Sequence, residues 1–247
     1  MKGVVISEKG TRSNIEDAYF VDENFSNKGW IYGGIYDGHG GAFAAKYASE
    51  KVHEYFLDNL ASVSNPEQAF VLSYETVSRD LYDQKSGTTA ADFLIKGRII
   101  FTANVGDTRT ILIRRNSVIQ LTSDHRLSNI AEEDRIKRVG TPISYPYIIS
   151  GGQGLMTTRS LGDQDLKNIG VIATPSLSTH LITKDDILLM TASDGLWDFI
   201  NNEEVAVLAK AHPDPESLIA ILSHEVLFTK LGTDNLTIIV VALSGKG

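Results

Sequence analysis

The sequence predicts an α+β fold in which a central antiparallel β-sandwich of two sheets is flanked by α-helices. About ten short runs rich in β-branched and apolar residues follow one another along the 247 residues. Several are joined by connections of three or four residues, such as 96–98 and 106–109, which are too short for a helical crossover and so imply antiparallel pairing. Amphipathic stretches of helical period lie between the runs. This number of strands, with a few helices, favours two sheets packed face to face with the helices outside.

The predicted strands differ in how apolar they are. The runs 187–192 and 236–242 are almost continuously apolar, which is typical of strands that are covered on both faces. A sandwich with helical outer layers requires such strands. The predicted strands span residues 4–7, 18–21, 30–36, 89–95, 99–105, 110–114, 118–122, 177–182, 187–193 and 236–243.

Helical periodicity appears between residues 41 and 84. Ala44, Ala48 and Val52 belong to the stripe of a first helix, and Asn65-Pro66 opens a second, with proline at the first helical position. Further helices are predicted over residues 131–139, 203–210 and 215–228. No internal repeat, low-complexity segment or Pro/Gly/Ser-rich linker interrupts the pattern, so we expect residues 1–247 to form a single domain.

Composition excludes several classes of protein. The chain has no cysteine, which excludes disulfides, thiolate metal sites and cysteine nucleophiles. Its formal net charge of −8 and its lack of a basic stripe argue against nucleic acid as a partner. No apolar run approaches the roughly 18 residues of a membrane helix, and the first dozen residues lack the apolar stretch of a signal peptide. We therefore expect a cytoplasmic protein that does not associate with membranes, and we expect it to be monomeric.

Carboxylates stand at the ends of the predicted strands in a regular way. Asp37 and Asp194 each follow a strand, Asp234 precedes the last strand, and Glu16-Asp17 precede the strand that starts at residue 18. In an antiparallel sheet, one strand begins where its neighbour ends. If the first two strands run opposite to the last two, these five carboxylates meet at one edge, and Asp107, in a hairpin turn, is a candidate to join them.

Two readings of these carboxylates remain open from the residues alone. Asp-Gly and Asp-Asn are common turn formers, which would be enough to explain any one position. Four positions with compatible strand polarity favour a metal site, because clustered carboxylates are costly unless cations lie among them. Oxygen ligands without cysteine suit Mg²⁺ or Mn²⁺ better than Zn²⁺ or copper. A carboxylate that bridges two such ions would hold a hydroxide nucleophile between them, for which a phosphate ester is the natural substrate.

The run Asp37-Gly38-His39-Gly40-Gly41 is the most specific local feature. His39 next to a metal-binding aspartate has two functional readings, a metal ligand or a general acid that protonates a leaving oxygen. The plain alternative is a polar loop histidine. Arg12, four residues before Glu16, has a planar guanidinium suited to a phosphate, although a lone arginine is by default a surface residue.

Together and in order, eight segments resemble the metal-dependent serine/threonine protein phosphatases of the PPM, or type 2C, family. The resemblance extends from about Gly3 to Leu243. The segments are RSNIEDAY from Arg12, YDGHGG from Tyr36, SGTTA from Ser86, NVGDTR from Asn104, the stretch 122–125, TTRSLGD from Thr157, ASDGLWD from Ala192 and GTDNLT from Gly232.

The resemblance implies a role for each candidate residue. Asp37 would bridge two Mg²⁺ or Mn²⁺ ions and the Gly38 carbonyl would bind one of them, while Asp194 and Asp234 would bind the other. Glu16 would bind the second ion directly or through water, with Asp17 orienting the ligands from behind. Arg12 would bind the phosphate, His39 would act as general acid, and Asp107 and Asp198 resemble a weaker third metal site.

The implied reaction is hydrolysis of phosphoserine or phosphothreonine in a phosphoprotein. A metal-bridging hydroxide attacks phosphorus in line and no phosphoenzyme forms. Two rivals remain: a pseudophosphatase that uses the same fold as a regulatory phosphoprotein-binding module, and a phosphoesterase for small molecules. Two segments depart from the family pattern. Residues 124–131 lack the proline that often follows the asparagine in the family. Residues 140–154, which we expect to form a flap beside the site, do not match the family's sequence.

Overall fold

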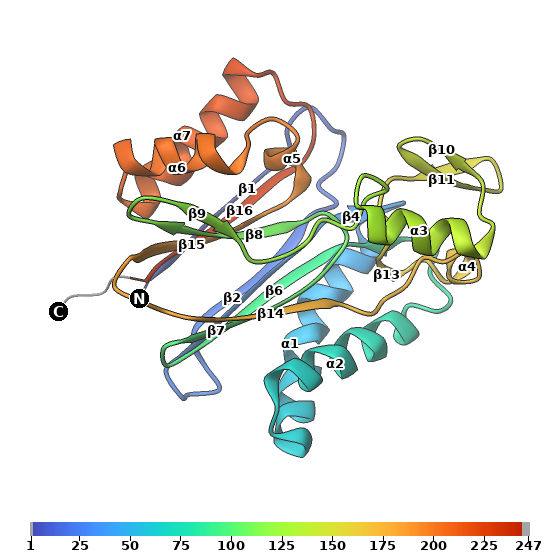
Figure 1. Cartoon of the computed structure of the whole chain (residues 1–247), viewed down its shortest axis with the longest axis horizontal. Coiled ribbons are helices and arrows are strands. Elements are labelled where there is room, and N and C mark those ends of the chain that lie inside the picture. Colours follow the sequence, from blue (N-terminus) through green and yellow to red (C-terminus); the bar gives the residue numbers. More distant parts are fainter. Residues whose placement is uncertain (1, 244–247) are drawn as a thin grey trace.

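The computed structural model describes residues 2–243 and contains two five-stranded antiparallel sheets packed face to face, with helices outside (Figure 1). The predicted α+β sandwich is therefore confirmed. The first sheet has the strand order β1-β16-β15-β8-β9. Its strands are β1 (Gly3–Glu8), β8 (Arg109–Arg114), β9 (Val118–Gln120), β15 (Asp186–Ala192) and β16 (Leu236–Ala242).

The second sheet has the order β14-β7-β6-β3-β2, and every neighbouring pair in it is antiparallel. The predicted short hairpin at 96–98 joins β6 to β7 in this sheet. The predicted hairpin at 106–109 is wrong, because this connection crosses from β7 to β8 of the first sheet. Its strands are β2 (Ala18–Phe25), β3 (Trp30–Tyr36), β6 (Ala90–Lys96), β7 (Ile99–Val105) and β14 (Ser176–Leu181).

Two pairs of helices cover the outer faces of the sandwich. In Figure 1, α1 (Phe43–Val63) and α2 (Pro66–Asp80) lie on the side of the second sheet, and α6 (Asn202–Ala211) and α7 (Pro215–His224) lie on the side of the first. The start of α2 is fixed by the Asn65 side chain, which accepts hydrogen bonds from two backbone N–H groups of the first turn. None of the helices among residues 2–243 is long and apolar enough to span a membrane.

Three apolar layers hold the sandwich together, one under each helix pair and one between the sheets. The central strand β15 shows how they form. Leu189 faces the layer between the sheets, whereas its neighbours Leu188 and Met190 face α6 and α7. Both faces of β15 and β16 are thus buried against apolar neighbours, which confirms the prediction from their sequences.

A smaller assembly extends from one end of the sandwich, to the right in Figure 1. A flap, residues 143–155, forms its own three-stranded sheet, and α3 lies beside it. Three two-residue strands link this region to the end of the sandwich in the order β13-β5-β4. The elements are β4 (Gly38–His39), β5 (Gly87–Thr88), α3 (Ile130–Val139), β10 (Ile143–Ser144), β11 (Tyr147–Ser150), β12 (Gln153–Leu155), β13 (Leu161–Gly162) and α4 (Gln164–Lys167).

The helix that precedes the last strand ends earlier than the sequence predicts. The helix predicted over residues 215–228 keeps α-helical geometry only to His224, and Glu225–Thr229 forms a π-helical turn. Periodicity does not reveal this turn because its five residues are too few for their period to be told from that of an α-helix. A short helix that the prediction missed, α5 (Asp194–Trp197), begins at Asp194 itself.

Candidate functional site

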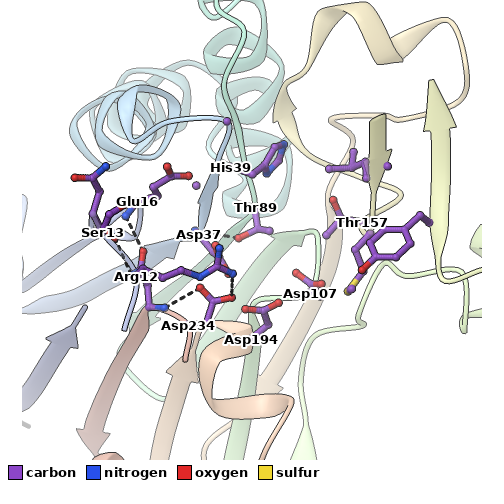
Figure 2. A pocket seen from close by; sticks show the side chains of 18 residues that line it. Arg12, Ser13, Glu16, Asp37, His39, Thr89, Asp107, Thr157, Asp194 and Asp234 are labelled. Atoms are coloured by element: carbon purple, nitrogen blue, oxygen red, sulfur yellow. Dashed lines mark hydrogen bonds and ion pairs between the residues drawn. The ribbon is translucent and has the colours of Figure 1, made fainter. Parts of the chain in front are cut away.

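The strand ends bring four predicted carboxylates to one end of the sandwich, two from each sheet. Asp37 follows β3 and Glu16 precedes β2 in the second sheet, whereas Asp194 follows β15 and Asp234 precedes β16 in the first. Figure 2 shows these side chains around one pocket of about 450 Å³, which His39, Asp107 and the flap also line. The expected convergence therefore occurs, but it joins two sheets rather than running along one.

A close backbone contact sets the spacing of the first-sheet pair. A Cβ atom on Gly195 would lie only 1.9 Å from the backbone oxygen of Asn235. Only glycine permits this approach, which places the residue after Asp194 against the residue after Asp234.

Asn235 also ties the N-terminal loop to the site. Its Nδ2 donates hydrogen bonds to the carbonyl oxygens of Lys9 (2.9 Å) and Asn14 (3.1 Å). Its Oδ1 accepts a hydrogen bond from the backbone N–H of Glu16 (2.7 Å). These contacts hold the loop that carries Arg12. Sequence reasoning assigned Asn235 nothing beyond a turn, although the Asp-Asn pair was visible.

The loop delivers Arg12 to the mouth of the pocket. Its Nη2 lies 2.6 Å from Asp234 Oδ2, and its side chain is 59% exposed. The guanidinium is thus positioned by one carboxylate while most of its surface stays open to a ligand. A surface ion pair of this kind adds little to stability.

His39 is held by a carboxylate that sequence reasoning missed. Its Nε2 lies 2.8 Å from Oδ2 of Asp163, which is largely buried. Burial opposes ionisation of Asp163, but the hydrogen bond and charge of His39 outweigh it and lower the pKa of Asp163. The carboxylate packs so tightly on Gly87 that a Cβ there would lie 2.1 Å from Asp163 Oδ2. The segment containing Asp163 matched the family pattern, but nothing local linked it to a histidine 124 residues away.

Asp107 and Asp198, predicted as a third metal site, are brought together around an arginine. Arg126 Nε lies 2.6 Å from Asp107 Oδ2 and Nη1 lies 2.8 Å from Asp198 Oδ1. A third nitrogen, Nη2, lies 3.1 Å from Asp194 Oδ2. Arg126 lies in a loop without periodicity, so no role could be predicted for it from the sequence.

Burial and mutual repulsion disturb the acidic groups strongly. Burial raises the pKa of Asp37 well above its usual range, and the carboxylates of Asp194, Asp17 and Asp107 raise it further. Burial, with Asp107 and Asp198, also raises the pKa of Asp194 to about 8. Asp17, behind the pocket, accepts a hydrogen bond from Ser193 Oγ (2.9 Å), yet burial raises its pKa to about 6. Such a cluster is stable when it is protonated or when cations lie near it.

The sequence matches one described family over most of its length. The model of protein phosphatase 2C matches residues 1–227. The chain belongs to the protein phosphatase 2C family. "Probable protein phosphatase 2C 7" of Oryza sativa subsp. japonica is 33% identical over 246 residues, covering 95% of this chain and 64% of the relative. "Probable protein phosphatase 2C 45" of the same organism is 31% identical, covering 98% of this chain and 87% of the relative. The chain spans just under two thirds of the first two relatives' lengths, 64% and 66%.

Solved structures support the same fold. The serine-threonine phosphatase 2C from Toxoplasma gondii superposes with a TM-score of 0.85 at 18% identity, covering 97% of this chain and 94% of that one. A bacterial serine phosphatase superposes with a TM-score of 0.78 at 22% identity, covering 100% and 99% of the two chains. At these identities the likeness establishes the protein phosphatase 2C fold.

Members of the protein phosphatase 2C family are generally metal-dependent, so the fit of this pocket to divalent cations can be tested on its donors. Among residues 2–243, no three His, Cys, Asp or Glu side chains form a ready-made metal site, and Arg12 and Arg126 hold Asp234 and Asp194. The chemistry nevertheless fits. The donors are hard carboxylate oxygens. Burial first, and then repulsion between neighbouring carboxylates, raises the pKa of Asp37 and of Asp194, and a divalent cation would offset both costs.

Proposed function

We propose that this chain is a metal-dependent protein phosphatase that hydrolyses phosphoserine and phosphothreonine, with residues 1–247 acting as one catalytic domain. The observation that carries the proposal is the meeting, in one pocket, of an exposed arginine, a carboxylate-bound histidine and four strand-end carboxylates. Membership of the protein phosphatase 2C family supports it, as do the names of the relatives.

Two Mg²⁺ or Mn²⁺ ions would be held by Asp37, Asp194 and Asp234, with the Gly38 carbonyl and Glu16 as further ligands. Asp17, which is buried behind Asp37, would orient it. The chemistry that the bound ions supply is activation of water and neutralisation of phosphate charge. Because water can then attack phosphorus directly, the chain needs no nucleophilic side chain, and we propose that no phosphoenzyme intermediate forms.

The chain's own side chains bind the substrate and move one proton. Arg12, with most of its guanidinium exposed, would form paired hydrogen bonds with the phosphate oxygens and align the phosphorus. His39 Nδ1, the ring nitrogen that is not hydrogen-bonded to Asp163, would donate a proton to the departing serine or threonine oxygen. Asp163, whose Oδ2 lies 2.8 Å from His39 Nε2, would keep the imidazole oriented.

The pseudophosphatase alternative predicts the loss of at least one site carboxylate. Asp37, Asp194, Asp234 and Glu16 are all present and face one pocket, so no observation favours that alternative. The alternative of a phosphoesterase for small molecules predicts a smaller preferred substrate. Comparing a phosphopeptide with a small alkyl phosphate distinguishes it from a protein phosphatase.

The test is hydrolysis of a phosphoserine peptide, measured as phosphate release, once with Mn²⁺ and once with a chelator. We expect phosphate release that needs Mn²⁺ and is restored when Mn²⁺ is added back after chelation. A phosphotyrosine peptide and a small alkyl phosphate, both expected to react more slowly, serve as controls. Full activity in chelator would exclude metal dependence, and faster turnover of the alkyl phosphate would favour the small-molecule alternative.

A further inference from the structure

Arg126 occupies the centre of the acidic group that the family pattern suggests as a third metal site. Each of its three guanidinium nitrogens contacts a different carboxylate, those of Asp107, Asp198 and Asp194, at 2.6–3.1 Å. A guanidinium is planar and always charged, with donors directed to its edges. All three of its edges therefore face an acid, as they would around a bound cation.

The burial of Asp107 makes this contact structurally important. Its side chain is only 3% exposed, and an ionised carboxylate in such a place is costly without a positive partner. Among the salt bridges within residues 2–243, Arg126 is the partner of Asp107, at 2.6 Å. Removing Arg126 would leave a buried acid in need of another cation.

The backbone of Arg126 is fixed on both sides, so the guanidinium is pre-positioned. The preceding residue, His125, donates its N–H to Gly106 O (2.9 Å) and accepts from Thr158 N–H (2.8 Å). Arg126 itself forms a β-bridge with Thr157. The Gly106 contact anchors the Arg126 backbone to the turn that carries Asp107, and the Thr157 bridge anchors it to the segment that follows the flap.

We propose that Arg126 is a built-in cation that takes the place of a third metal ion, so that this chain binds two divalent ions and not three. This inference rests on the proposed function, which supplies the two divalent ions. It concerns how many ions each chain binds and not the rate of phosphopeptide hydrolysis. A third ion could enter only by displacing the guanidinium from three carboxylates at once. The sequence-based expectation that Asp107 and Asp198 form a third metal site is thereby replaced by an internal ion-pair network.

The test counts Mn²⁺ bound per chain at saturation, by equilibrium dialysis with metal analysis. We expect two ions in the wild type and three in Arg126→Ala. The additional ion should be lost again in the double variant Arg126→Ala/Asp107→Asn, because the acid that recruits it is then neutral. As a second readout, Mn²⁺ should raise the melting temperature of Arg126→Ala by more than it raises that of the wild type.

Arg114→Ala is the matched control. Arg114 Nε lies 2.8 Å from Oδ1 of the buried Asp186 at the opposite end of β8, so its loss removes a similar ion pair. It should lower stability and leave the Mn²⁺ count at two. Arg126→Lys, which keeps one positive charge without the fork, should bind the additional ion more weakly than Arg126→Ala.

A third ion in the wild type, or an unchanged count in a folded Arg126→Ala, would overturn the proposal. If Arg126→Ala does not fold, the wild-type and Arg126→Lys counts decide: three ions in the wild type, or the same count in both, would overturn it. Failure of the proposed function looks different. A wild type that binds two ions but hydrolyses no phosphopeptide would leave the role of Arg126 intact.

Discussion

His39 Nε2 and Asp163 Oδ2 lie 2.8 Å apart, and they come from parts of the chain separated by 124 residues. The pair is formed by the small β13-β5-β4 sheet. Its strand β4 contains His39, and β13 ends at Gly162, directly before Asp163. The central strand β5 contains Gly87, whose missing side chain leaves room for the carboxylate. The sheet therefore places the proposed proton donor, His39, against the carboxylate that would orient it.

Replacing Asp163 with asparagine should reduce turnover of phosphopeptides roughly 10- to 100-fold, since a disoriented general acid loses part of its contribution. Esters with good leaving groups, such as p-nitrophenyl phosphate, should lose much less because their departing oxygen needs no proton. Asp165→Asn, a change at an exposed position on α4, should behave as wild type. Equal losses on both substrates would remove Asp163 from this role, as they would remove His39 in a parallel His39→Ala measurement.

Gly195→Ala should destabilise the fold by about 3 kcal/mol or more, because its Cβ would lie 1.9 Å from a backbone oxygen that cannot rotate away. The strain would also separate Asp194 from Asp234, so Mn²⁺ affinity should fall with stability. Urea denaturation and Mn²⁺ titration measure both effects. Gly3→Ala, where the nearest atom is a valine methyl at 3.3 Å, is the control. A Gly195→Ala variant as stable as Gly3→Ala would show that Gly195 does not approach the Asn235 backbone oxygen this closely.

Glu132 should make stability depend on pH in the acid range. Burial would raise its pKa, but hydrogen bonds from Arg159, Thr158 and Arg135 outweigh burial and lower the pKa to about 2. A folded pKa below the unfolded value stabilises the fold at pH above about 4.5, and the gain is lost as pH falls toward 2. The gain is roughly 3 kcal/mol. Urea denaturation from pH 3 to 6 should show a weaker pH dependence for Glu132→Gln. If the free energy of unfolding changes with pH equally in wild type and Glu132→Gln, the lowered pKa of Glu132 is contradicted.

Asp92 should have the opposite effect, because burial raises its pKa to about 6 although the hydroxyls of Tyr36, Tyr74 and Tyr32 donate hydrogen bonds to it. A raised folded pKa stabilises the fold below about pH 4, and the gain is lost as pH rises through 6. Asp92→Asn mimics the neutral acid. Relative to wild type, its free energy of unfolding should therefore gain about 2 kcal/mol between pH 4.5 and 8. Asp58→Asn, at an exposed position, is the control. If the free energies of unfolding of wild type and Asp92→Asn differ by the same amount at every pH, the raised pKa of Asp92 is refuted.

Strand polarity made half of the site predictable. Asp37, Asp194, Asp234 and Glu16 stand next to regular strands, and the side chains at the end of a strand have their place fixed by the sheet. The turn after His39 was predictable as well, because two consecutive glycines favour a turn. Gly40 and Gly41 both have positive φ (69° and 119°). Local sequence was sufficient because each of these residues is positioned by the element next to it.

The residues that were missed are positioned by contacts between loops. Asp163 and Arg126 lie in segments without periodicity, and their partners become neighbours only after the small sheet and the flap have formed. A local pattern holds no signal for such pairs. The same limit applies to the possible third metal site. The family resemblance suggests Asp107 and Asp198 as its ligands, and nothing in the sequence shows that Arg126 lies between them.

The most direct test of the proposed metal-dependent hydrolysis is phosphate release from a phosphoserine peptide by Asp37→Asn at saturating Mn²⁺. This substitution keeps the shape of the side chain and removes the negative charge between the two sheets. We predict a loss of roughly 100-fold or more relative to wild type, with Asp83→Asn, at an exposed position, unaffected. Wild-type turnover by a folded Asp37→Asn would contradict the account.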